Sequence, residues 1–182
     1  AYIGGLGAAL ATMVANLSSH KRGWDDKWEE YSIIAESGQR YIQKLEDLVD
    51  KDTEAFNAIL DAFRIKTNTK EDESLKEKEI QKATLNAINI PLSIMETSFQ
   101  SMDIIETLVN IGNPNSVSDV GVAVLCARSA IIGGYLNVMI NIKDYDNEDK
   151  KIAIIKKANK LKNDAIKKET KILKNVLQVI NK

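Results

Sequence analysis

Groups that could do chemistry gather in residues 112–123, where a polar turn runs into a stretch of small apolar residues. Asn-Pro and Gly-Asn pairs break regular structure there. Ser116 with Asp119 is typical of a variant capping box, and Ser118 is an alternative N-cap. Such a helix start places a carboxylate, hydroxyls and amides beside free backbone N–H groups. The carboxylate could transfer protons, but an ordinary capped helix start explains the same pattern.

Two amides interrupt the apolar stretch that follows. Residues 120–132 leave almost no polar face, and Arg128, Asn137 and Asn141 are the polar exceptions. Asn137 and Asn141 are four residues apart, so they lie on one face of a helix. Buried amides need hydrogen-bond partners, so this pair either links helices or contacts a polar ligand. A helix that is apolar on all sides belongs at the centre of a bundle or in an oligomer interface.

Histidine and cysteine occur once each, as His20 and Cys126. A single cysteine excludes an internal disulfide and a multi-cysteine zinc site, and it is compatible with a reducing cytoplasm. Because the usual imidazole and thiolate ligands are missing, a metal would have to be held by carboxylates, and no metal site is expected.

The elements that must position these groups are predicted to be helices. The chain of 182 residues has only two prolines and nine glycines, which favours helix. Helices are expected at residues 2–17, 25–63, 71–109, 118–141 and 147–180, with a kink at Pro91. No segment has the period-2 pattern of a strand. The predicted fold is one all-α domain over residues 1–182, an up-and-down bundle of about five long helices.

Charge is distributed unevenly along the chain. From Lys150 onward eleven lysines stand against Asp164 and Glu169 alone. A basic helix of this kind could meet nucleic acid or an acidic partner, but a solvated lysine face is the expected interpretation, and no nucleic-acid partner is predicted. Residues 1–17 are apolar but too short to cross a bilayer, and no basic region precedes them. No membrane association is expected, and the predicted location is cytoplasmic.

The segment 112–119, followed by Gly-Tyr-Leu-Asn-Val-Met-Ile-Asn-Ile at 134–142, resembles the cyclodeaminase/cyclohydrolase family of one-carbon folate metabolism. Further motifs follow in the family's order. They are the small-residue stretch 7–17, an Asp-x-x-Ala-Phe element at 52–56, Ala-Phe-Arg at 62–64 and Ile-Pro-Leu at 90–92. The resemblance covers nearly the whole chain and implies an oligomeric helical bundle.

The sequence departs from the family pattern in two places. Family members typically open with another helix and a Pro-Gly-Gly-Gly-Ser loop, whereas this sequence starts at Ala1, after that point. We therefore expect that the N-terminal helix and the glycine-rich loop are missing from it. Where relatives read Arg-Leu-Pro-Lys, this chain reads Arg64-Ile65-Lys66-Thr67, so the loop lysine is displaced by one residue or absent.

The resemblance implies two reactions that share one carbon. A cyclodeaminase closes 5-formiminotetrahydrofolate to 5,10-methenyltetrahydrofolate and expels ammonia, and a cyclohydrolase adds water to the methenyl bridge. Asp119, which matches the family's Ser-Asp pair, is the first candidate for proton transfer, and Asp52 is the second. The resemblance also implies these substrate-binding residues: Asn113, Ser118, Asn137, Asn141, Arg64 and Lys66. The last two are cations that could hold the glutamate tail.

Cyclodeaminase activity is the preferred hypothesis, with cyclohydrolase activity as the alternative, because the same groups serve both reactions. A non-catalytic helical assembly domain is the competing class. The folate enters as substrate, so no separate cofactor is expected. Expected partners are a second copy of the chain, in a homodimer or higher homo-oligomer, and a formiminotransferase as a candidate.

Overall fold

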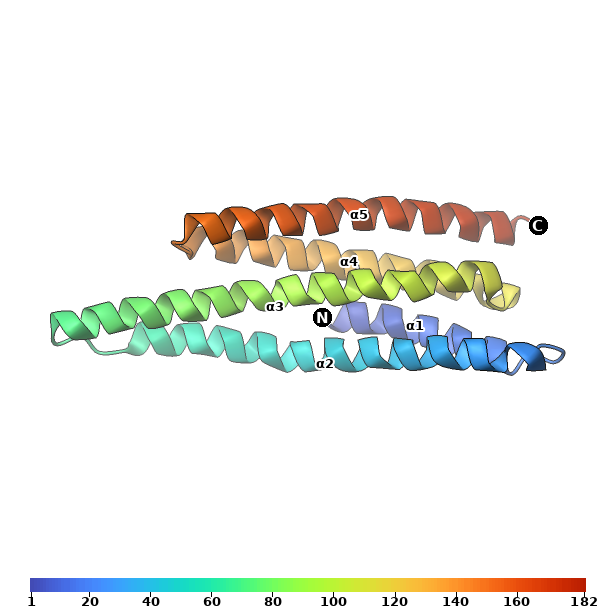
Figure 1. Ribbon diagram of the computed structural model, residues 1–182, viewed down its shortest axis with the longest axis horizontal. Coiled ribbons are helices and arrows are strands. Elements are labelled where there is room, and N and C mark those ends of the chain that lie inside the picture. Colours follow the sequence, from blue (N-terminus) through green and yellow to red (C-terminus); the bar gives the residue numbers. More distant parts are fainter.

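Five long helices run up and down along one axis and build nearly the whole chain (Figure 1). The computed structural model describes residues 1–182 and contains no strand. The helices are α1 (Tyr2–Ser19), α2 (Trp28–Arg64), α3 (Lys70–Ile111), α4 (Val117–Asn141) and α5 (Glu148–Ile180). Three short 3₁₀ turns are η1 (Asp25–Lys27), η2 (Pro114–Ser116) and η3 (Ile142–Asp144). The predicted all-α, up-and-down bundle is confirmed, and α3 continues through Pro91 without a break.

The first four helices surround a common core, and α5 packs along α3 and α4. Helix α1 has 18 residues, against 37 in α2 and 42 in α3. It therefore begins near the middle of the bundle, while the connected ends of α2 and α3 reach beyond the other helices (Figure 1).

Small residues let α4 lie very close to its neighbours, as the glycine- and alanine-rich sequence predicts. A Cβ atom on Gly7 would stand 2.8 Å from the carbonyl oxygen of Ala123, so α1 touches the backbone of α4. A Cβ atom on Gly134 would stand 2.7 Å from Met95 Cγ and 2.9 Å from the carbonyl oxygen of Pro91. Any side chain at these glycines would push the helices apart, because packed interiors have no spare volume.

The start of α4 differs from the predicted capping box. Ser116 precedes the helix, but its hydroxyl makes no capping hydrogen bond, and Ser118 already lies in the first turn. The side chain of Asn113 instead accepts a hydrogen bond from the backbone N–H of Asn115, at 3.2 Å, and caps η2. The prediction was wrong because a 3₁₀ turn is inserted between the polar loop and α4, which moves the cap upstream.

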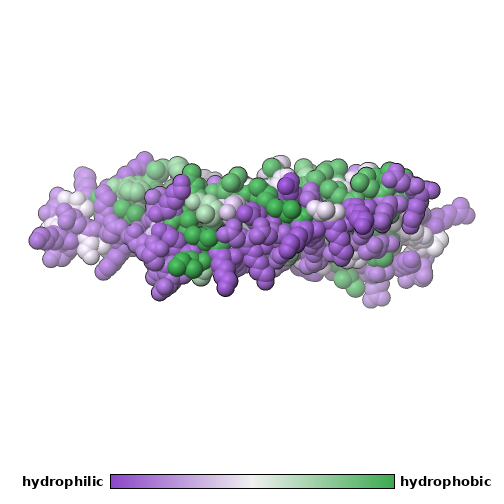
Figure 2. All heavy atoms as spheres, turned by 90° about the horizontal axis from the view of Figure 1, so that it is seen from above, coloured by the Kyte–Doolittle hydropathy of each residue, from purple (hydrophilic) through white to green (hydrophobic).

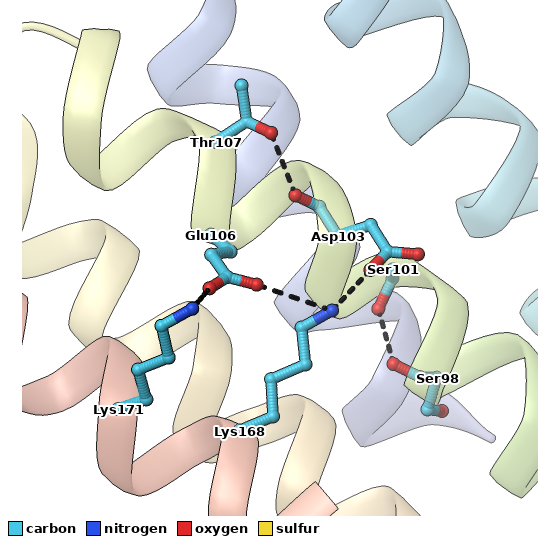
Figure 3. Close-up of polar contacts among 7 residues, drawn as sticks. All are labelled: Ser98, Ser101, Asp103, Glu106, Thr107, Lys168 and Lys171. Carbon is cyan, nitrogen blue, oxygen red and sulfur yellow. Dashed lines mark hydrogen bonds and ion pairs between the residues drawn. The ribbon is translucent and has the colours of Figure 1, made fainter.

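Ion pairs fasten the lysine-rich helix α5 to acidic residues of α3. Figure 3 shows Glu106 between Lys168 and Lys171, with nitrogen–oxygen distances of 3.6 and 2.7 Å. Lys168 also pairs with Asp103, and Lys157 pairs with Glu96. The apolar side of α5 faces the core through Ala158, Ala165, Ile172 and Val176, whereas Ile180, at the end of the helix, is 53% exposed. Part of the basic charge of α5 is thus neutralised within the chain.

The segment Pro114–Asp144, which contains α4, is long and apolar enough to cross a membrane by length and composition alone. Core helices of soluble proteins have the same composition. One side of α4 is buried against α1, α3 and α5, through residues such as Val120, Val124, Ala127 and Ile131. These contacts account for much of its apolar character.

Candidate active site

Asp52 and Asn137 each line two neighbouring cavities, which lie beyond the start of α1. One cavity, of about 330 Å³, is lined by both residues together with Asn141 and Phe56. The other, of about 270 Å³, shares Asp52 and Asn137 and extends to Pro91 and the first residues of α1. Two adjoining hollows of this size approach the volume of small-molecule sites, which is about 300–1,000 Å³. Of the predicted site residues, Asp52, Asn137 and Asn141 are therefore brought together.

Three helices place these groups. Asp52 is exposed in the middle of α2, three residues before the buried Ala55 that anchors this turn in the bundle. Asn137 is exposed one turn after Gly133 on α4, and its amide nitrogen donates to the carbonyl oxygen of Gly133 at 3.2 Å. That bond lies within its own helix, so the side-chain oxygen of Asn137 is left without a protein donor. A carboxylate and a free amide oxygen thus line the same hollow.

Asp52 lines the smaller cavity together with Ala1, the residue that precedes α1. A cationic group entering this cavity would meet the Asp52 carboxylate.

Asn141 is engaged differently from Asn137. Its amide nitrogen donates to the backbone carbonyl oxygen of Ala87 in α3, at 2.8 Å, and the side chain is half-buried. Of the two roles that the sequence left open for this pair of amides, Asn141 therefore has the helix-linking one, although it also lines the larger cavity.

A second group of predicted residues lies at the opposite end of α4. Asp119 is half-buried in the first turn and Ser118 is exposed. The backbone N–H of Asn113 donates to the hydroxyl of Ser18, at 2.8 Å. Asp119 and Asn137 are eighteen residues apart in one helix, which separates them by about 27 Å. The two groups cannot act on the same carbon within one chain.

The predicted cations Arg64 and Lys66 lie at the far tip of the bundle. Arg64 ends α2, about 18 Å along the helix from Asp52, and pairs with Asp61 at 3.3 Å with 75% of its side chain exposed. Lys66 is exposed in the segment between α2 and α3. Neither residue lines the cavities at Asp52.

A third cavity, of about 670 Å³, lies between α2 and α3 and is separate from the two cavities at Asp52. Its charged residues are Asp61, Glu79 and Lys82. Asp61 pairs with Arg64, and Lys82 pairs with Glu79 at 3.4 Å. These charges pair with one another, and the amides of Asn86 and Asn89 also line this cavity. The smaller pair of cavities differs in having a carboxylate, Asp52, that makes no ion pair with the protein.

Two hydroxyls at the site were missed by sequence reasoning. Ser129 on α4 lines the smaller cavity and Thr53 on α2 lines the larger one. Ser129 had a usable signal, because it is a polar residue in a nearly apolar helix and lies eight residues, or two turns, before Asn137. Thr53 had none, since α2 is rich in polar residues throughout.

The bundle thus carries a carboxylate and two amides around cavities of small-molecule size. Comparison with known proteins identifies the class of protein. Residues 1–160 match the family model described as formiminotransferase-cyclodeaminase. The chain belongs to this family of one-carbon folate enzymes, as its sequence motifs indicated.

Relatives carry two different names. The chain is 32% identical over 144 residues to a methenyltetrahydrofolate cyclohydrolase from Methylorubrum extorquens, covering 79% of this chain and 69% of that protein. It is 31% identical over 148 residues to the formimidoyltransferase-cyclodeaminase of Mus musculus, covering 81% of this chain but 27% of the mouse protein. The fold matches the crystal structure of a formiminotetrahydrofolate cyclodeaminase from Thermotoga maritima, with a TM-score of 0.79 and 25% identity over 97% of this chain and 85% of that one.

Proposed function

We propose that this protein cyclises 5-formiminotetrahydrofolate to 5,10-methenyltetrahydrofolate with release of ammonia, and that Asp52 is the proton-transfer group. The observation that supports this assignment is the meeting of Asp52 and Asn137 between two cavities in a chain of this family. The similarity in fold to a named cyclodeaminase over nearly the whole chain favours the same reaction.

The reaction needs one proton to move between two nitrogens. The folate N10 attacks the carbon of the protonated, cationic formimino group on N5, and a tetrahedral carbon bonded to three nitrogens forms. The Asp52 carboxylate accepts the proton from N10 and returns it to the amino group, which leaves as ammonia when its bond to carbon breaks. A positioned acid–base group of this kind contributes about 10²–10⁴-fold to the rate. The negative charge of Asp52 also stabilises the cationic formimino and methenyl species.

The remaining residues of the site bind rather than react. The free side-chain oxygen of Asn137 accepts a hydrogen bond from the folate, and Phe56, which is 61% exposed at the larger cavity, offers an apolar surface for the rings. Arg64 and Lys66 lie toward the tip of the bundle, with Arg64 about 18 Å along α2 from Asp52, and the glutamate tail of an elongated substrate would have to extend that far to reach them. Fixed cations are suited to such carboxylates.

The cyclohydrolase reaction is the second candidate, favoured by the 32% identity to a protein of that name. Here Asp52 would take a proton from water as the water oxygen bonds to the methenyl carbon. The same proton would then reach N5 when the bond between that carbon and N5 breaks, and the hydroxyl proton of the adduct would be released to solvent as the formyl carbonyl forms. One carboxylate and one amide serve both reactions, so the site geometry is common to them.

The methenyl chromophore distinguishes these reactions. Near-ultraviolet absorbance should rise when the protein receives 5-formiminotetrahydrofolate; a fall with methenyltetrahydrofolate, above the spontaneous rate, would establish the cyclohydrolase instead. Asp52→Asn should lower turnover by about 10²–10⁴-fold, without lowering Tm, because the side chain is exposed. Asp50→Asn, another exposed α2 substitution, is the matched control. Full activity in Asp52→Asn would overturn the assignment.

We further propose that the chain works as a cytoplasmic homodimer. Exposed apolar side chains form two parallel stripes, here called the apolar face: Tyr2, Ile3, Leu6, Met13 and Leu17 of α1, and Val122, Leu125, Leu136 and Ile140 of α4. Figure 2 shows apolar residues gathered along one edge of the molecule while polar residues cover much of the remainder. Contiguous exposed apolar surface of this extent is typical of a protein interface. A formiminotransferase is a candidate second partner, because the mouse relative's name includes both activities.

A further inference from the structure

Pro91 leaves one backbone carbonyl of α3 without its usual partner. In a regular helix the N–H of residue 91 would donate to the carbonyl oxygen of Ala87, but proline has no N–H. Ala87 is 8% exposed, so solvent offers its carbonyl little compensation. A buried backbone acceptor of this kind is expected to find another donor.

Asn141 supplies that donor from another helix. Its amide nitrogen lies 2.8 Å from the Ala87 carbonyl oxygen. The position of α4 here is fixed by Gly134, seven residues earlier, whose missing side chain lets the helix approach Pro91 and Met95. Seven residues are two helical turns, so Gly134 and Asn141 present the same side of α4 to α3. The close approach and the hydrogen bond therefore act at neighbouring points of one contact.

We propose that Asn141 is a positioning residue that replaces the missing N–H of Pro91 and thereby sets the distance between α3 and α4 at the active site. Ala87 and Asn141 line the larger cavity beside Asp52 and Asn137, and Pro91 lines the smaller one. The hydrogen bond thus connects α3 and α4 at the cavity that Asp52 and Asn137 also line. The existence of this link is independent of the reaction, whereas its effect on turnover rests on the proposed function.

A double-mutant cycle on thermal unfolding tests the link. Asn141→Ala should lower Tm by about 3–8 °C, because it leaves the buried Ala87 carbonyl unpaired. Pro91→Ala restores a backbone N–H that can donate to Ala87, so adding Asn141→Ala to Pro91→Ala should lower Tm by less than about a third of that amount. Asn163→Ala, at an exposed position of α5, controls for the substitution itself. Equal losses of Tm in both backgrounds would overturn the proposal.

Turnover of the same four proteins separates positioning from direct substrate binding. If Asn141 acts only through Ala87, Asn141→Ala lowers kcat and the Pro91→Ala, Asn141→Ala double variant regains most of the kcat of Pro91→Ala. If the double variant regains Tm but not activity, Asn141 contacts the substrate and the positioning role is rejected. Absence of turnover in the unmodified protein would count against the proposed function. The double-mutant cycle on Tm would still test whether Asn141 replaces the missing N–H of Pro91.

Discussion

At the scale of single residues, the two aspartates that the sequence offers for proton transfer have different surroundings. Asp52 lines two adjoining cavities that Asn137 also lines. Asp119 stands in the first turn of α4 with no ion pair or hydrogen bond to a neighbouring side chain, and it does not line the cavity of about 430 Å³ that Asn113 lines at that end. An acidic residue in a first helical turn is explained by its favourable interaction with the helix dipole.

Asp119→Asn is therefore expected to change stability more than turnover. Loss of the first-turn charge should lower the free energy of unfolding by about 0.3–1 kcal/mol, measured by urea titration. Turnover of either folate substrate should stay within about twofold of the unmodified protein, because Asp119 lies about 27 Å from Asn137. A large loss of kcat with unchanged stability would instead show that Asp119 takes part in a site, which in this geometry would require a second chain.

At the scale of helices, the attachment of α5 depends on pH. The hydrogen bond from Lys171 lowers the pKa of Glu106 below its ordinary value, opposed by burial and aided by the charges of Lys168 and Lys171. A carboxyl with a lowered pKa in the folded state stabilises the fold above its ordinary pKa, and this contribution is lost as pH falls through the lowered value.

Glu106→Gln should accordingly lower Tm by about 1–3 °C at pH 7, because partly exposed ion pairs are worth up to about 1 kcal/mol. The difference in Tm between the two proteins should shrink as pH falls below the ordinary carboxyl value of 4.5. Glu36→Gln, at an exposed α2 position, should show no such trend. A difference that stays constant down to about pH 3 would mean that the charge of Glu106 does not fasten α5.

The positions of the helices along the chain could be predicted from the sequence, but the contacts between residues of different helices could not. Apolar periodicity and turn residues are local, so the predicted boundaries closely follow those of all five helices. The proposed site residues were gathered by motif, and they fall into separate groups: Asp52, Asn137 and Asn141 line one cavity, whereas helix rise carries Asp119 far from Asn137 along α4. Asp52 and Asn137 line the same cavity because α2 and α4 both pack against α3. A local sequence pattern does not predict such a contact between distant segments. The hydrogen bond between Asn141 and Ala87 likewise could not be predicted from the sequence, although Pro91 indicates that one backbone carbonyl of its helix lacks its usual donor.

At the scale of the whole molecule, the apolar face has dimensions that suit a second copy. Helix α1 has 18 residues, or about 27 Å, and two helices side by side are about 20 Å wide. The shared face therefore covers on the order of 500 Å² in projection, and α4 extends it further. Stable interfaces bury about 800 Å² of accessible surface per partner. Tyr2 and Ile3 belong both to the apolar face and to the smaller cavity, so a second chain on this face would also border the active site.

Leu125→Glu should therefore convert a dimer into a monomer in sedimentation equilibrium. A carboxylate at this position, 42% exposed in the middle of the apolar face, would lose its hydration in the interface without a partner charge. Leu177→Glu is the matched control, since Leu177 is a 56% exposed leucine on α5, outside the apolar face, and this variant should stay dimeric. If the second copy borders the substrate cavity, Leu125→Glu should also raise KM, although Leu125 lies about 18 Å along α4 from Asn137. An unmodified protein that sediments as a monomer at micromolar concentration would show that the apolar face does not join two copies of this chain, and the dimer proposal would be rejected.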